Sequence, residues 1–170
     1  MTDRETRLAE LLDKQALTEL VYRYARAVDR KDLDRLGRLY HPDAHHDHGG
    51  LFAGTPQEFV DWLKASMGDV ETQHLIANAL FVVEGERARG EIYTVNFHHM
   101  PGQASNYIAG GRYLDDYVRH EGRWLFARRL RVIDWSEERP AQAGGTAALI
   151  LRGKALPEDA AQALEPFFRD

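Results

Sequence analysis

The sequence contains no cysteine and no long apolar run. Without thiols the chain can form neither disulfides nor a thiolate zinc site, so any metal would need histidine and carboxylate ligands. A membrane-spanning helix needs about 20 consecutive apolar residues, and the longest apolar stretch near the end of the chain, residues 146–151, is far shorter. We therefore expect a protein of the reducing cytoplasm that does not enter a membrane.

Positive charge is also scarce. The 170 residues include 22 Lys and Arg against 27 Asp and Glu, for a formal net charge of -5, and the basic residues form no cluster suited to phosphates. The chain is charged from its third residue and lacks the unbroken apolar segment of a signal peptide. This composition argues against nucleic acid as a partner and against export, and the length fits one domain.

The first part of the chain has the spacing of helices. Thr2 and Glu5 have the capping-box spacing, and a long helix is predicted over residues 4–29. A second, shorter helix is expected after residues 30–31 and should end at Pro42, because proline cannot continue a helix. The apolar positions at helical spacing are Leu8, Leu11, Leu12, Leu17, Leu20, Val21, Tyr24 and Val28, followed by Leu33, Leu36, Leu39 and Tyr40.

A short strand and a third helix are predicted next. Residues 44–48 run into the glycine pair 49–50, a pattern typical of a strand that enters a turn. The third helix should cover residues 55–67, with Thr55 as N-cap and Pro56 at the first helical position. This helix could cover a cavity.

The later part of the chain has the composition of strands. Its segments are rich in β-branched and aromatic residues and are separated by turns that contain glycine, which predicts consecutive antiparallel strands. The predicted strands are 74–84, 87–99, 107–119 and 123–135. Helices followed by such strands indicate the α+β class, here a cone-shaped α+β barrel in which a curved sheet wraps around the long first helix. That shape has one concave mouth for a small ligand.

The chain is expected to form one α+β barrel domain over residues 1–140 and a tail over residues 141–170. The tail should begin with a linker at residues 141–145 and form a short helix within residues 157–168. The apolar residues expected to dock on the body or on a neighbouring subunit are Leu164, Phe167 and Phe168.

Short motifs in order along residues 8–136 are similar to those of a known family. They are 24–29 (YARAVD), 40–44 (YHPDA), 47–49 (DHG), 72–74 (TQH), 122–129 (GRWLFARR) and 134–135 (DW). The chain resembles the SnoaL-like branch of the nuclear transport factor 2-like superfamily, which includes scytalone dehydratase, hexachlorocyclohexane dehydrochlorinase and bile-acid 7α-dehydratase. The resemblance implies a homo-oligomer, a trimer before a dimer, and a lyase or isomerase that uses neither metal nor organic cofactor.

The resemblance also implies an acid–base pair, in which Asp29 orients His74. A neutral imidazole takes a proton from carbon only if its other nitrogen is held and its growing charge is stabilised, which a carboxylate does. The helical wheel alone puts Asp29 about 120° from the apolar centre, the position of a solvated residue. His74 shares its predicted strand face with Ile76, Leu80 and Val82, where a polar ring must find a partner. A satisfied core histidine is the alternative for His74.

Tyr24 and Arg129 are further catalytic candidates by the same resemblance. The Tyr24 phenol could donate a proton to a leaving oxygen or steady an enolate, and its alternative is an amphipathic core tyrosine. Arg129 matches a family arginine that can face the leaving group. However, Arg128, Arg129 and Arg131 occupy both faces of their strand, so alternation does not decide which one turns inward, and at least one should be an outer salt-bridge partner.

A histidine-rich segment invites a metal interpretation. It contains His41, His45, His46, Asp47 and His48, and imidazole and carboxylate suit zinc or iron. Alternation places His46 and His48 on one face and the residues between them on the other, so a short strand supplies too few ligands unless His98 or His99 adds one. No metal is expected, and the resemblance suggests instead that His48 lines the pocket as a hydrogen-bonding group.

The pocket wall is predicted to include part of the strand at residues 87–99. Asn96 and His98 share a face with Ile92 and Thr94 by alternation. Related dehydratases place an Asp or a second His near position 96, and an Asn cannot act as acid or base. Asn96 could instead hydrogen-bond a substrate hydroxyl or carbonyl, while His98 replaces the missing acid. The aromatic residues that could bind a substrate ring, or simply pack the core, are Phe52, Trp62, Phe97, Tyr113 and Trp135.

These observations favour a cofactor-independent lyase for a small aromatic or alicyclic substrate. His74, oriented by Asp29, would remove a proton, and water, a halide or a small carbonyl fragment such as formaldehyde would leave. An isomerase of the same fold is the second choice, and a non-catalytic ligand-binding or assembly domain is the alternative from another class. An enzyme requires the two side chains within hydrogen-bond reach beside an open hollow.

Overall fold

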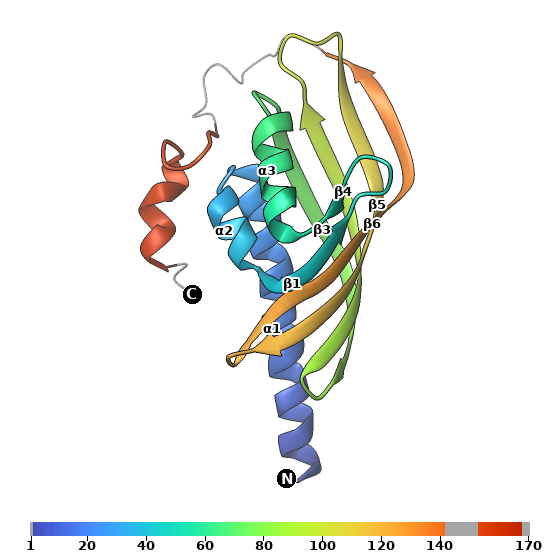
Figure 1. Ribbon diagram of the computed structural model, residues 1–170, viewed down its shortest axis with the longest axis vertical. Helices are drawn as coiled ribbons and strands as arrows, with labels where there is room; N and C mark the ends of the chain where they lie inside the picture. Colours follow the sequence, from blue (N-terminus) through green and yellow to red (C-terminus); the bar gives the residue numbers. More distant parts are fainter. Residues whose placement is uncertain (1, 142–152, 168–170) are drawn as a thin grey trace.

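The computed structural model describes residues 2–141 and 153–167, with helices on the inner side of a curved, six-stranded sheet (Figure 1). The sheet order is β2-β1-β6-β5-β4-β3, mixed but mainly antiparallel. The elements are α1 (Asp3–Asp29), α2 (Leu33–Arg38), β1 (Tyr40–Asp47), β2 (Ala53–Gly54), α3 (Pro56–Ser66), β3 (Glu71–Glu84), β4 (Arg87–His99), β5 (Ser105–His120), β6 (Arg123–Pro140) and the 3-10 helix η2 (Ala160–Phe167). The predicted α+β class is confirmed.

Helix α1 begins with the predicted capping box and packs on the sheet from Asp13 onward, where its carboxylate accepts from Arg119 and Trp124. Thr2 and Glu5 satisfy each other's backbone N–H groups. The buried positions of α1 begin at Leu17. Leu8, Leu11 and Leu12 are exposed, contrary to their predicted place on the inward face, because the helix extends past the sheet (Figure 1).

The predicted second helix is too long. Helix α2 ends at Arg38, and residues from Tyr40 onward form strand β1, which pairs in parallel with β6. The register of this pairing shifts between Tyr40 and His45, where Pro42 cannot donate a ladder hydrogen bond. Proline therefore marks an irregular strand rather than a helix end.

Strands β3 to β6 form the predicted antiparallel succession, with one irregularity that changes a face. Gly85 and Gly122 turn the hairpins with positive φ angles of 62° and 79°. The β3–β4 register shifts between Ile76 and Ala79, so the side chains beyond the shift change sides. Leu80 and Val82 are 68% and 61% exposed, and the prediction that they share the face of His74 is wrong.

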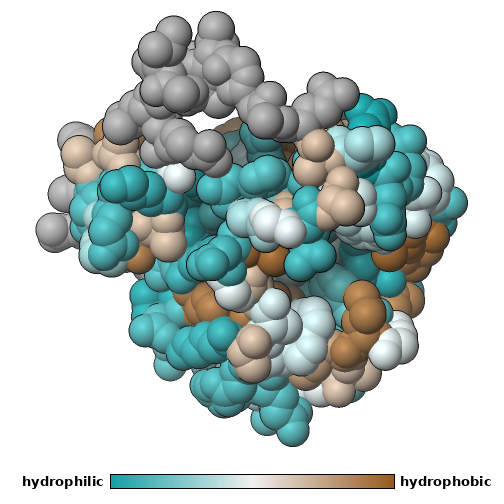
Figure 2. Space-filling view, turned by 90° about the horizontal axis from the view of Figure 1, so that it is seen from above, coloured by the Kyte–Doolittle hydropathy of each residue, from teal (hydrophilic) through white to brown (hydrophobic). Residues whose placement is uncertain are grey.

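The core lies between the inner face of the sheet and the helices. Its largest fully buried apolar side chains come from α1, α3, β4, β5 and β6, so sheet and helices close on one another. They are Tyr24, Phe59, Ile92, Tyr113, Tyr117 and Phe126. No helix among the described residues is long and apolar enough to cross a membrane. Seen from above, the surface is mostly hydrophilic, with separate hydrophobic patches (Figure 2).

The segment that leads into η2 is held to the domain by polar contacts. The Asp159 carboxylate lies 3.3 Å from the Arg30 guanidinium, and the backbone N–H of Leu156 donates to the Arg30 carbonyl at 2.9 Å. Leu164 is half-exposed, so it is not buried on the body of this chain. The predicted docking of the Phe167 side chain and of Phe168 falls outside the described part, and docking on a neighbouring subunit stays a prediction, as does the domain division.

Candidate active site

Asp29 and His74 form a buried hydrogen-bonded pair where α1 ends beside β3. His74 Nδ1 lies 2.6 Å from Asp29 Oδ1, and the side chains are 8% and 11% exposed. A carboxylate only accepts, so Nδ1 carries the hydrogen and Nε2 keeps a free lone pair. Asp29 also accepts from the His74 backbone N–H at 2.9 Å and from the Thr72 hydroxyl at 2.8 Å. In the neutral ring this arrangement leaves Nε2 as the nitrogen that can accept a proton.

The pair lies on the wall of an open hollow of about 710 Å³. This hollow is bounded by α1, by the start of β3 and by residues 159–161. The helical wheel placed Asp29 on a solvated face. The structure shelters it because β3 crosses the end of α1 there, an arrangement that spacing along one helix does not contain.

A group of polar side chains lies beside His74 on the inner face of the sheet, and we call it the inner polar patch. Its members are Thr94, Asn96, His98 and Arg131, and none of them lines the 710 Å³ hollow. Asn96 is the cross-strand partner of His74, and the His98 ring centroid lies 6.1 Å from that of His74. Three buried atoms of the patch have no hydrogen-bond partner within residues 2–141 and 153–167, namely Thr94 Oγ1, Asn96 Oδ1 and His98 Nδ1. Such atoms can be satisfied by a polar ligand.

Two further imidazoles of the site are neutral at neutral pH. Burial, followed by the charge of Arg131, lowers the pKa of His48 to about 3. Burial, followed by the charge of His74, lowers the pKa of His98 to about 4. His74 contributes to the lowered pKa of both His48 and His98.

Arg129 turns inward, but into the core. It is 0% exposed and binds the Asp115 carboxylate through Nε at 2.8 Å and Nη2 at 2.6 Å. Its guanidinium lies 4.1 Å from the ring centroids of Tyr24, Tyr113 and Phe126. Burial raises the pKa of Tyr24, so its phenol keeps its proton. Direct action of Tyr24 and Arg129 on a substrate stays a prediction, with Arg129 Nη1 as a buried atom that has no partner among the described residues.

The structure shows which of the three arginines near the middle of β6 turn inward. Arg128 is exposed, whereas Arg129 and Arg131 are both buried on the inner face of β6. A Cβ added to Gly111 would lie 2.7 Å from Arg131 Nη1, so this guanidinium rests on the bare backbone of β5. Arg131 is thus the cation of the inner polar patch.

The predicted ring-binding tryptophans lie on opposite sides of the sheet. Trp62 on α3 stacks on Phe59, and its ring centroid lies 6.3 Å from that of His48. Trp135 is half-exposed and lies on Gly110, in the outward row of β5, because the β5–β6 register shifts next to this pair. The structure brings Trp62 toward the site and does not bring Trp135 there.

Sequence reasoning missed several residues of the site. Thr72 alternates with His74 and could have been found by that spacing. Asp115 alternates with Tyr113 and Tyr117, which places a carboxylate on an aromatic face and was a usable signal.

No group of three or more potential metal ligands occurs in the part of the chain that the structure describes.

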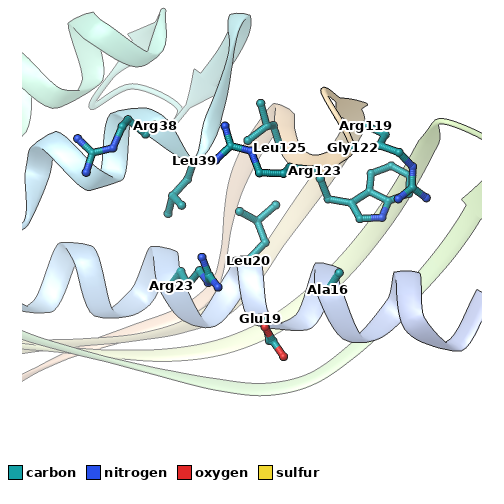
Figure 3. A pocket seen from close by; sticks show the side chains of 11 residues that line it. Ala16, Glu19, Leu20, Arg23, Arg38, Leu39, Arg119, Gly122, Arg123 and Leu125 are labelled. Carbon is teal, nitrogen blue, oxygen red and sulfur yellow. The ribbon is translucent and has the colours of Figure 1, made fainter. Parts of the chain in front are cut away.

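A second hollow, of about 260 Å³, lies away from the acid–base pair (Figure 3). Leu20, Leu39 and Leu125 lie between Arg23 and Arg38 on one side and the β5–β6 hairpin on the other. Its lining contains no histidine and Glu19 as the single carboxylate, so it offers no paired acid and base.

Fold and site together define a small α+β cone with a paired carboxylate and imidazole beside a hollow. A family model described as the SnoaL-like domain matches residues 9–130, and this chain belongs to that family. The resemblance seen in the sequence motifs is confirmed.

Relatives share the fold at low sequence identity. An uncharacterized protein of Mycobacterium tuberculosis H37Rv is 28% identical over 130 residues, which cover 74% of this chain and 88% of that protein. A putative scytalone dehydratase from Novosphingobium aromaticivorans superimposes with a TM-score of 0.71 and 18% identity, over 88% of this chain and 96% of the other. A type 2 hexachlorocyclohexane dehydrochlorinase gives 0.74 and 17%, over 82% and 97%. These structures show the shared nuclear transport factor 2-like fold.

Proposed function

We propose that this protein is a cofactor-independent lyase that eliminates a small leaving group from an aromatic or alicyclic substrate. The observation that carries the proposal is the 2.6 Å contact between Asp29 Oδ1 and His74 Nδ1 on the wall of an open hollow. It leaves one imidazole nitrogen free to accept a proton and supplies a carboxylate to stabilise the charge that results.

The proposed reaction begins with proton transfer from a substrate carbon to His74 Nε2. The electron pair of the broken C–H bond forms a carbon–carbon double bond, and the leaving group departs with the electrons of its own bond. The imidazolium that forms is stabilised by the adjacent Asp29 carboxylate. His74 then returns its proton to the leaving group or to water, so the step is balanced without an external oxidant or cofactor.

Polar groups beside His74 on the inner face of the sheet, apart from the lining of the 710 Å³ hollow, are proposed to hold the substrate. Neutral His48 and cationic Arg131 supply donors for a substrate oxygen that gains negative charge. Asn96 Oδ1 and Thr94 Oγ1 supply unpartnered acceptors for a substrate hydroxyl. Trp62 offers an aromatic surface beside His48. We assign substrate binding to these residues, and a direct role for Arg129 requires a ligand that reaches its unpartnered Nη1.

The names of structural neighbours support elimination as the reaction class. One is called a putative scytalone dehydratase and another a hexachlorocyclohexane dehydrochlorinase, and both names describe the loss of a small group. An isomerase is the second candidate, because the His98 ring lies 6.1 Å from His74 and could return the proton at a different carbon. We also propose a homo-oligomer, a trimer first, in the cytoplasm.

The proposal is tested by His74→Ala, assayed by mass spectrometry and proton NMR against hydroxylated and halogenated cyclic compounds. Turnover should fall by about 10²–10⁴-fold, which a positioned general base contributes. The melting temperature should stay within a few degrees. His45→Ala, which removes an exposed histidine of β1, is the matched control and should leave turnover unchanged.

Two outcomes would contradict the proposal. If His74→Ala unfolds the protein, the imidazole is a core group rather than a base. If the wild-type protein binds these compounds without converting any, and His74→Ala binds them equally well, the domain is a non-catalytic binding module.

A further inference from the structure

A chain of hydrogen bonds runs from Tyr40 through His46 to His48, at and just beyond strand β1, and the proposed reaction uses only its last member. The Tyr40 hydroxyl lies 2.7 Å from His46 Nδ1, and His46 Nε2 lies 2.6 Å from His48 Nδ1. His46 is 0% exposed, and its ring stacks on Phe59 with 3.6 Å between centroids. The ring of His46 is therefore fixed in place, and each of its nitrogens has one partner.

The protonation states of Tyr40, His46 and His48 limit which group donates in each of these hydrogen bonds. Burial raises the pKa of Tyr40, so its hydroxyl keeps its hydrogen. Burial, followed by the charge of His48, lowers the pKa of His46, which is therefore neutral like His48. Each imidazole then has one N–H donor and one acceptor nitrogen.

The Tyr40 hydrogen selects between the two possible directions. Within residues 2–141 and 153–167, His46 Nδ1 is the hydrogen-bond partner of the Tyr40 hydroxyl. If Tyr40 donates to Nδ1, then His46 Nε2 carries its hydrogen and donates to His48 Nδ1, and every buried hydrogen is satisfied. In the reverse direction the Tyr40 hydroxyl hydrogen would be buried without an acceptor, which is unfavourable.

The satisfied direction leaves the His48 hydrogen on Nε2. This nitrogen lies on the side of the ring away from Nδ1, and it has no partner among the described residues. The His48 ring centroid lies 5.8 Å from that of Phe59 and 6.3 Å from that of Trp62, and burial followed by the charges of Arg131, Arg129 and His74 lowers its pKa. It is only partly buried, so Nε2 is not sealed in the core as His46 is.

We propose that Tyr40 and His46 are positioning residues that hold His48 as its Nε2–H tautomer, and that this N–H donates to a carbonyl or hydroxyl oxygen of the substrate. A neutral donor with a fixed hydrogen stabilises developing negative charge without competing with His74 for the proton. The proposal narrows the substrate class to ring compounds that carry a carbonyl or hydroxyl oxygen. This inference rests on the proposed lyase activity.

The tautomers can be measured without any substrate. Two-bond proton–nitrogen NMR correlations on the ¹⁵N-histidine-labelled full chain distinguish Nε2–H from Nδ1–H imidazoles. At pH 7 both His46 and His48 should give the Nε2–H pattern, with signals assigned by their loss in His46→Gln and His48→Gln. An Nδ1–H pattern for wild-type His48 would overturn the proposal.

Variants separate positioning from simple packing. Tyr40→Phe removes the first donor and should replace the single His48 pattern by a mixture of tautomers, whereas Tyr93→Phe, at an exposed tyrosine, should not. In His46→Gln the side-chain oxygen can accept from Tyr40 and the amide can donate to His48, so the Nε2–H form should persist. In His46→Leu it should be lost. An unchanged single pattern in both Tyr40→Phe and His46→Leu would show that the chain does not set the tautomer.

A kinetic readout links the tautomer to the reaction. With a substrate that carries a carbonyl oxygen, Tyr40→Phe should lower kcat several-fold and leave KM nearly unchanged, because the donor acts most strongly in the transition state. An unchanged kcat together with mixed tautomers would overturn the assignment of His48 as the donor. If His74→Ala turned over the substrate as fast as wild type, the lyase proposal would be overturned, while the NMR result on the tautomers would stand.

Discussion

The Asp29 carboxylate holds both the ring and the backbone of His74. Its Oδ1 accepts from Nδ1 at 2.6 Å, and its Oδ2 accepts from the His74 backbone N–H at 2.9 Å. One residue at the end of α1 therefore fixes the position of β3 and the tautomer of the proposed base at the same time. A change at Asp29 should affect stability and turnover together.

We expect Asp29→Asn to lower turnover by about 10²–10⁴-fold, because an amide neither stabilises an imidazolium nor enforces the Nδ1–H tautomer. Stability should fall by about 1–3 kcal/mol, since one of the buried donors now faces an NH₂ group. Steady-state kinetics and urea unfolding measure the two effects. Asp43→Asn, at an exposed position of β1, is the control, and an Asp29→Asn enzyme of wild-type rate would exclude the pair as the catalytic base.

Removing one partner of the buried Arg129–Asp115 ion pair should lower the free energy of unfolding more than replacing both partners by apolar residues. Both side chains are 0% exposed. Asp115→Ala leaves a buried cation without its partner and should cost about 3–5 kcal/mol in urea unfolding. The double variant Arg129→Met with Asp115→Leu should recover most of this loss, because neither charge then has to be desolvated. A single variant as stable as wild type would contradict the burial of the pair.

Stability should fall with acidity between about pH 6.5 and pH 4. His48 and His98 have lowered folded-state pKa values of about 3 and about 4, so in this window the unfolded chain binds protons that the folded chain does not. Stability therefore rises with pH, by about 1 kcal/mol per pH unit for each such histidine near pH 5. Urea unfolding at pH 7, 6 and 5 measures the free energy of unfolding, which should change less with pH in His98→Gln than in wild type. An unchanged pH dependence would refute the lowered pKa of His98. His45→Gln is the control.

Gly111 should not tolerate a side chain. An added Cβ would collide with the backbone carbonyl of Val132 and approach Arg131 Nη1 to 2.7 Å. Gly111→Ala should therefore destabilise the protein by about 1–3 kcal/mol and displace the Arg131 guanidinium. A Cβ at Gly50 meets no atom within 4 Å, so Gly50→Ala is the control in thermal unfolding. Equal melting temperatures for the two variants would contradict the close packing at Gly111.

Local signals in the sequence predicted most elements correctly. The Thr2–Glu5 capping box and the Thr55 N-cap mark the starts of α1 and α3, because these side chains satisfy the first backbone N–H groups of a helix wherever the helix lies in the fold. Gly85 and Gly122 mark hairpins, because the turns require positive φ. The helix predicted up to Pro42 was wrong, because these residues pair as strand β1 with β6, which is more distant along the chain than any local signal reaches.

The candidate site was less accessible from the sequence. Asp29 looked solvated on its own helix, and only the family resemblance paired it with His74. The faces of Leu80 and Trp135 could not be predicted, because one irregular register position reverses the alternation of every residue beyond it. The orientation of Arg129 and Arg131 was open for another reason, because arginines occupy both faces of their strand and alternation alone does not say which face is buried.

By itself, the sequence determined the α+β class, the helix starts, the hairpin turns and the family, because these depend on residues close together along the chain. Tertiary structure alone decided that Arg129 is locked to Asp115 and that Tyr40, His46 and His48 form one chain of hydrogen bonds, and it supplied the contact between Asp29 on α1 and His74 on β3 that the family resemblance had implied. Each of these depends on where strands cross and on their register, and a hydrogen bond depends on distances of tenths of an ångström.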